Sequence, residues 1–134
     1  MSKYTLYTDL CVDEPTLLAA LAELGFGPDA LERGRALPLF GYQGDRRPET
    51  ADLVIRRRHL LPASNDLGFQ RTPTGLVPVI SAYDQRRLRI GDQPFLTALK
   101  TAVHTRKALE IARRFGGRVT QRREGDRLVI RARR

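Results

Sequence analysis

The chain has 134 residues, with 24 lysines and arginines against 15 aspartates and glutamates and a formal net charge of +9. Its 41% of hydrophobic residues can bury a core, and two cores of half this length would be barely stable, so we expect one domain over residues 1–134. One cysteine, Cys11, and two histidines, His59 and His104, argue against a disulfide framework, a metal centre or a bound cofactor.

The first half of the chain predicts a strand, a helix and two further strands. Residues 3–11 alternate and are rich in Tyr and Thr, which favours a strand. Asp13 can cap a helix that ends at Gly25, a residue suited to a helix C-terminus. The next segments are a loop or a frayed turn at 27–35 and strands at 37–43 and 52–59, separated by a polar linker at 44–50.

The second half predicts two hairpins on either side of a long helix. The first hairpin pairs residues 67–71 with 75–83 across a Pro-Thr turn. Asp92 is expected to cap the helix, over about residues 93–115, and two glycines stop it. The closing hairpin pairs 118–123 with 127–133.

These elements predict an α+β fold, with a mainly antiparallel sheet and two helices on one face. Residues 51–56 resemble residues 125–131, and each segment follows a helix that ends at a glycine beside a phenylalanine. One interpretation is a duplicated βαββ unit that forms a single sheet. The alternative is that Leu-Val-Ile is simply a common strand triplet.

Positive charge is concentrated in the second part of the chain. Residues 1–85 hold nine basic and eleven acidic residues, whereas residues 86–134 hold fifteen and four. Such asymmetry is typical of proteins that bind a polyanion. Because 21 of the 24 basic residues are arginine, a GC-rich genome and an ordinary solvated face would explain it as well. The candidate polyanion-binding residues are Arg122, Arg123, Arg127 and Arg131.

Aromatic residues that could stack on bases are not concentrated in the basic half. Arginines 86, 87 and 89 could add to a phosphate-binding groove. The aromatic residues Tyr4, Tyr7, Phe40 and Tyr42 lie in the less basic half. We therefore expect weak nucleic-acid binding without sequence preference.

The long helix carries apolar residues on two sides. At about 100° per residue, Leu96 and Val103 lie near Leu99, whereas Ile111 and Phe115 lie about 120–180° away. A flat sheet cannot cover both sides of a straight helix. Either the helix bends, or one side contacts a protein partner or a second copy of the chain. The candidate partner-binding residues are Leu96, Leu99, Val103, Ile111 and Phe115.

Candidate catalytic residues are few. His104 lies on an apolar helical stripe, which is typical of a packed core histidine, although an enzyme centred on His104 stays open as a third function. Cys11 ends a predicted strand, where a small buried thiol is the ordinary role. Nucleophile-elbow, phosphate-loop and paired His-Glu motifs are missing. We expect no catalytic residue.

Several short motifs together resemble a known family. They are Glu23-Leu24-Gly25-Phe26, Gly41-Tyr42-Gln43-Gly44, residues 51–56, Leu67-Gly68-Phe69, Ala102-Val103-His104 and the closing Arg-rich hairpin. The chain resembles a domain-of-unknown-function family that includes the hypothetical chloroplast open reading frame thirty-five of algae and its cyanobacterial and other bacterial relatives. It departs from that family at Thr101, Val103 and Tyr83, where the family has aromatic residues ahead of the histidine and a Trp-containing strand. The resemblance transfers no site residue.

The resemblance implies an accessory subunit of a bacterial multi-protein system, such as a stress or defence system that works with an AAA-type ATPase. We therefore expect a non-enzymatic interaction subunit that binds a protein partner through the long helix or a sheet edge. The alternative is a nucleic-acid-binding accessory protein that uses its Arg-rich C-terminal half. Since no run approaches the roughly 18 apolar residues of a membrane span, and residues 1–5 lack a signal pattern, we expect a cytoplasmic protein without membrane contact.

Overall fold

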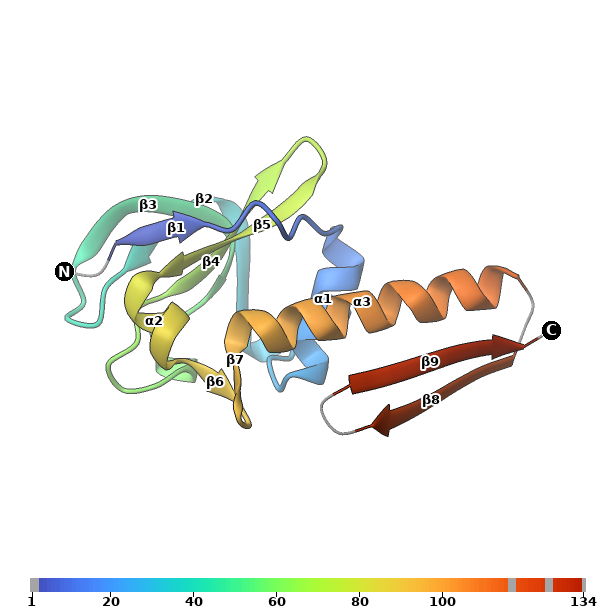
Figure 1. Cartoon of the computed structure of the whole chain (residues 1–134). Coiled ribbons are helices and arrows are strands. Elements are labelled where there is room, and N and C mark those ends of the chain that lie inside the picture. The colour runs from blue at the N-terminus through green and yellow to red at the C-terminus, as the bar shows by residue number, and fades with distance from the viewer. Residues whose placement is uncertain (1–2, 116–117, 125–126, 134) are drawn as a thin grey trace.

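Five antiparallel strands form the main sheet, in the order β1-β5-β4-β3-β2 (Figure 1). They are β1 (Tyr4–Leu6), β2 (Leu31–Phe40), β3 (Arg46–Ile55), β4 (Leu67–Thr72) and β5 (Gly75–Ser81). The computed structural model describes residues 3–115, 118–124 and 127–133, the last two segments by their backbone. The expected α+β class with a mainly antiparallel sheet is confirmed.

Helices and two small ribbons complete the described chain. The helices are α1 (Glu14–Glu23), α2 (Ala82–Arg87) and α3 (Phe95–Arg114), with short 3-10 turns at Pro28–Ala30 and Arg57–His59. The ribbons pair β6 (Arg89–Ile90) with β7 (Gln93–Pro94), and β8 (Arg118–Glu124) with β9 (Arg127–Arg133). Within the described segments, no helix is both long and apolar enough to cross a membrane.

The first helix begins and ends as its sequence predicts. The Asp13 carboxylate accepts a hydrogen bond from the Thr16 N–H at 3.2 Å, which satisfies one of the free amides of the first turn. Gly25 takes a φ of 99°, a conformation that glycine adopts readily. The Phe26 N–H then donates to the Leu21 carbonyl at 2.8 Å and closes the helix.

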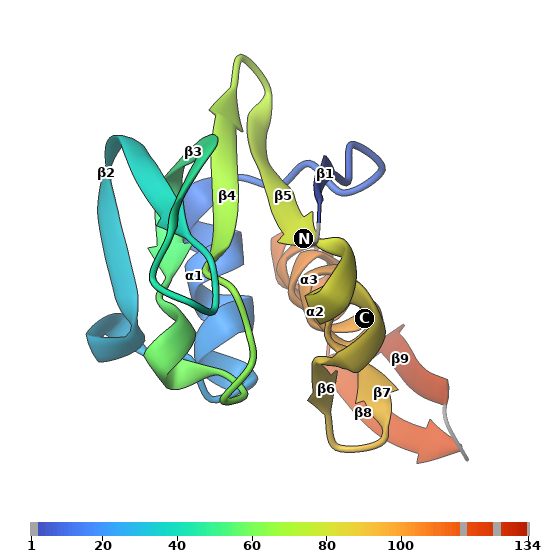
Figure 2. The same cartoon turned by 90° about the vertical axis from the view of Figure 1, so that its left-hand side faces the viewer.

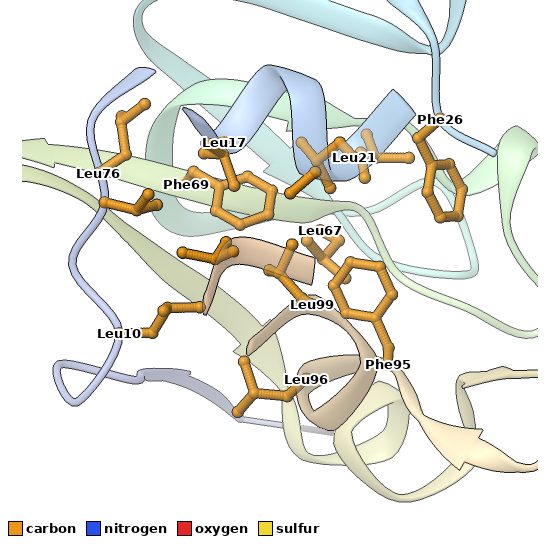
Figure 3. Close-up of a cluster of buried hydrophobic side chains, with 14 of the residues drawn as sticks. Leu10, Leu17, Leu21, Phe26, Leu67, Phe69, Leu76, Phe95, Leu96 and Leu99 are labelled. Carbon is orange, nitrogen blue, oxygen red and sulfur yellow. The ribbon is translucent and has the colours of Figure 1, made fainter. Parts of the chain in front are cut away.

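The main core lies between one face of the sheet and the two longer helices (Figure 3). Helix α1 contributes Leu17 and Leu21, and α3 contributes Leu99, all fully buried. Leu67 and Phe69 of β4 face them from the sheet. Figure 2 shows α1 and α3 on the same side of the sheet, as expected from the sequence.

The other face of the sheet is closed by the sheet itself. Leu39, Ala51, Val54 and Val79 form a second buried cluster there. The Arg47 guanidinium of β3 lies 5.7 Å from the centre of the Tyr4 ring of β1, although two strands separate β1 from β3 in the sheet. The sheet therefore curls strongly, which brings its far hairpin back over its own surface.

Several local predictions are wrong, among them the strand expected at 3–11, of which only Tyr4–Leu6 form β1. Residues 31–35 belong to β2 and residues 46–50 to β3, so the expected loop and linker are a long hairpin. The charged residues of these two segments made the hairpin look like a loop in the sequence, because the outer strand of a sheet faces water. Asp92 lies in the turn between β6 and β7, and Pro94 immediately precedes α3. The short helix α2 was not expected from the sequence.

The order strand, helix, strand, strand does occur twice, in β1-α1-β2-β3 and, with short insertions, in β5-α3-β8-β9. The second pair of strands does not join the main sheet. The β8–β9 hairpin forms a sheet of its own and lies against α3 (Figure 1). The repeat in the sequence therefore does not produce one shared sheet.

Candidate functional site

The first half of α3 belongs to the core. Leu96 is 6% exposed, and Leu99 and Val103 are fully buried. In the folded chain these three residues are unavailable to a partner, because the sheet and α1 already cover them. Their assignment as partner-binding residues is therefore corrected.

The second half of α3 extends beyond the main sheet (Figure 1). Ile111 and Phe115 are exposed there, by 53% and 62%. Ala112 is the one buried residue of this described helix after Thr105. This partial docking explains why α3 carries apolar residues on two sides. One side packs on the sheet, and the other faces outward near the C-terminus of the helix.

Basic residues surround the exposed apolar pair. At about 100° per residue, His104, Lys107 and Arg114 lie within about 60° of Ile111 on the helix surface. Arg114 forms an i,i+4 ion pair with Glu110 at 3.1 Å. We call the set His104, Lys107, Ile111, Arg114 and Phe115 the outer face of α3. An apolar centre flanked by the side chains of Lys107 and Arg114 suits a partner that is itself acidic.

The exposure of the two histidines and of the cysteine can be compared with the sequence expectations. His104 is exposed, not packed in the core as its position on the stripe predicted. His59 is exposed at the end of a 3-10 turn. The Cys11 thiol is partly buried, with Sγ 3.3 Å from the Thr74 hydroxyl. Across the described residues, no three histidine, cysteine, aspartate or glutamate side chains gather as a metal site would require.

The candidate polyanion-binding residues lie in the β8–β9 hairpin, and their side chains are outside the described part of the structure. The backbone register pairs Arg122 with Val129, Thr120 with Arg131 and Glu124 with Arg127. Because strand residues alternate between faces, Arg122, Arg127 and Arg131 share one face and Arg123 is placed on the other. Arg118 and Arg133 are placed with the first three.

The outer sheet edge at β2 is poorly suited to pairing with another strand. Its register with β3 shifts between Arg33 and Leu37, where Ala36 has a φ of 51°. Asp52 holds this irregular segment by accepting the Ala36 N–H at 2.9 Å. Bulges, charges and a proline such as Pro38 are features that protect sheet edges from strand addition.

A buried polar cluster joins the loop before β4 to the start of α2. Its members are Ser64, Asn65, Asp66, Ser81 and Asp84, each at most 2% exposed. The Asp66 carboxylate accepts the Phe40 N–H at 2.9 Å, the Arg57 N–H at 2.8 Å and the Arg56 guanidinium at 2.8 Å. Asp66 therefore ties the loop before β4 to two other segments.

Asp84 joins this cluster to α2. Its Oδ2 accepts hydrogen bonds from the Ser81 hydroxyl at 2.9 Å and the Asn65 N–H at 3.1 Å. Burial raises the pKa of Asp84, and hydrogen bonds from Ser64, Ser81 and Asn65 oppose that rise. The network fixes the loop at Asn65 against the start of α2.

A pocket of about 760 Å³ opens above this network. The described residues that line it are Lys3, Tyr42, Ala63, Asn65, Ala82, Tyr83 and Arg86. They come from the residue just before β1, the β2–β3 turn, the loop before β4 and α2. Tyr42 and Arg86 were singled out separately in the sequence, but no local motif placed them together, because the fold joins segments that are up to 83 positions apart.

Comparisons of the chain with protein-family models, with curated proteins and with solved structures give no significant match.

Proposed function

We propose that this protein is a non-enzymatic accessory subunit that binds an acidic protein partner through the outer face of α3. The observation that supports the proposal is the exposure of Ile111 and Phe115 on a helix whose first half is buried. An apolar pair at i,i+4 is a typical anchor for a partner. The resemblance to a family expected in multi-protein systems agrees with this role.

Charge gives the partner its chemistry. Lys107 and Arg114 flank the apolar pair, and residues 86–134 carry fifteen basic and four acidic residues. A partner segment with apolar residues between aspartates or glutamates would complement this surface. Salt should then slow association, because screening weakens the long-range attraction.

Matched substitutions test the proposal. Ile111→Asp places a charge on the exposed side and should leave the fold intact while weakening partner binding at least tenfold. Leu99→Asp buries an unpaired charge and should unfold the chain. Leu61→Asp is the control, because Leu61 is 40% exposed and lies outside α3.

The tagged wild-type protein is first used to isolate a partner from its native host. The partner is then purified, and its affinity for each folded variant is measured by titration calorimetry. Light scattering over a range of concentrations tests self-association. Equal affinity of the wild type and Ile111→Asp for the partner, or for a second copy, would refute the proposal.

A second candidate function is polyanion binding by the β8–β9 hairpin. It is favoured by the register, which places five arginine positions on one face. A two-stranded ribbon fits the major groove of duplex DNA. Replacement of Arg122, Arg127 and Arg131 by Gln should weaken DNA binding and flatten its log–log salt dependence by about 3, since each phosphate contact contributes roughly 0.9. Arg123→Gln, on the other face, should change both much less.

A further inference from the structure

The fold unites aromatic and cationic residues that the sequence keeps apart. Tyr42 belongs to the less basic part of the chain, and Arg86 begins the strongly basic part. Both line the pocket above the buried polar cluster, together with Tyr83 and Lys3. Aromatic and basic residues that are far apart in the sequence therefore lie together in this pocket.

The pocket wall is built to stay in place. The Tyr42 N–H donates to the Asn65 side-chain oxygen at 3.0 Å, and the Tyr42 carbonyl accepts from the Arg57 guanidinium at 2.7 Å. The Asn65 amide in turn donates to the Ser81 hydroxyl at 2.9 Å. The backbone of Tyr42 is thus held while its side chain stays 49% exposed.

The described lining is positively charged. Lys3 and Arg86 are its ionisable groups besides the two tyrosines, and no described acidic side chain lines it. The carboxylate of Asp66, in the polar cluster, is paired with Arg56. A ligand in this pocket therefore meets two cations that can accept a negative group.

The volume of the pocket and the residue types that line it suit a single nucleotide. Ala63 and Ala82 leave room between the larger side chains. Its volume of about 760 Å³ is within the range of roughly 300–1,000 Å³ that holds ligands of this size. Aromatic rings provide stacking surfaces for bases, and lysine and arginine bind phosphate.

We propose that this pocket binds a nucleotide, with its base against Tyr42 and Tyr83 and its phosphate at Lys3 and Arg86. The nucleotide is either a free mononucleotide or one unit of a single strand, since both present the same base and phosphate. The site is separate from the outer face of α3, so the inference does not depend on the partner proposal.

Proton NMR of the tyrosine rings tests this inference in the full-length chain. The protein has four tyrosines and no tryptophan, so each ring can be assigned. Adenosine 5′-monophosphate should shift the rings of Tyr42 and Tyr83 but not that of Tyr7. Adenosine and inorganic phosphate, each alone, should bind at least tenfold more weakly.

Two arginine variants provide a matched pair. Arg86→Gln should weaken nucleotide binding about tenfold, whereas Arg87→Gln, the same change one position along α2, should not. Tyr42→Ala should weaken binding by a similar factor through lost stacking. Because its backbone contacts remain, this variant should stay folded.

The affinity for a five-nucleotide single strand, compared with that for adenosine 5′-monophosphate, shows which form of nucleotide the pocket binds. Tighter binding of the strand than of the monophosphate indicates a nucleic acid, and weaker binding indicates a free nucleotide; both support the site. Absence of tyrosine shifts with either probe at millimolar concentration would overturn it. So would equal binding by Arg86→Gln, or occupation of the pocket by an acidic peptide alone.

Discussion

Gly68→Ala is a sharp test of how the curled sheet is packed. Gly68 lies in the middle of a cross-strand row, opposite Val54 on β3 and Val79 on β5. A Cβ at this position would lie 2.5 Å from the Ala51 Cβ and 3.2 Å from the nearest Leu39 methyl. Carbon atoms pack at about 3.5–4.0 Å, so the far hairpin would have to move outward by roughly 1 Å.

The cost of that movement can be estimated. The Ala51 Cβ is attached directly to the backbone, so no rotamer change relieves the contact. Overpacking of this kind costs about 1–3 kcal/mol. For a chain of this length each kcal/mol lowers the melting temperature by roughly 3–5 °C. Urea unfolding followed by circular dichroism measures the change in the free energy of unfolding.

Gly27→Ala is the control for the same substitution. Gly27 has a φ of −76°, and an added Cβ there meets nothing within 4 Å. The free energy of unfolding should rise by about 0.4–1 kcal/mol, because alanine reduces the entropy of the unfolded chain. Ala51→Gly should recover stability in the Gly68→Ala background. If Gly68→Ala is as stable as Gly27→Ala, the packing argument is wrong.

Three further changes should separate the roles of the polar groups. Asp66→Ala leaves the Phe40 and Arg57 N–H groups without an acceptor in a buried site, while Arg56 keeps its ion pair with Glu32. The loss of two buried hydrogen bonds should cost about 3–5 kcal/mol of unfolding free energy, and a loss below about 1 kcal/mol in urea unfolding would contradict this. Burial raises the pKa of Asp84 in the folded chain, so the folded chain keeps a proton that the unfolded chain loses above about pH 4. The free energy of unfolding of the wild type, relative to that of Asp84→Asn, should therefore fall as the pH rises above about 4. Urea titrations from pH 3 to 7 check the sign, and a flat difference would refute it. His104→Gln changes an exposed side chain and should alter the free energy of unfolding by less than about 0.5 kcal/mol. A larger loss would show that the His104 side chain is packed.

Local signals predicted the elements that depend on local physics. The cap at Asp13, the stop at Gly25 and the hairpin of β4 and β5 follow from residues close together in sequence. The long β2–β3 hairpin was missed because its stability comes from the curl of the sheet and from side chains such as Asp52, not from an alternating pattern. Its charged outer strand resembles a loop in composition.

Only part of the candidate site could be predicted, because local signals do not show how distant segments pack together. Helical periodicity separated Leu99 from Ile111, but it could not tell that the first half of the helix is docked and the second half extends past the sheet. His104 is exposed although its sequence neighbours are apolar, because neighbours along a helix do not by themselves bury a side chain. The pocket at Tyr42 and Arg86 depends wholly on tertiary contacts, so no spacing could have marked it.

The outer face of α3 is tested most directly by site-specific photo-crosslinking in the native host. A photoreactive residue at position 111 is compared with one at position 61, which is also apolar and exposed but lies outside α3. We predict one adduct of defined mass at position 111, which is lost when Lys107 and Arg114 are changed to Glu, and none at position 61. The same adducts at both positions, or none at position 111 while the partner still binds, would contradict the account.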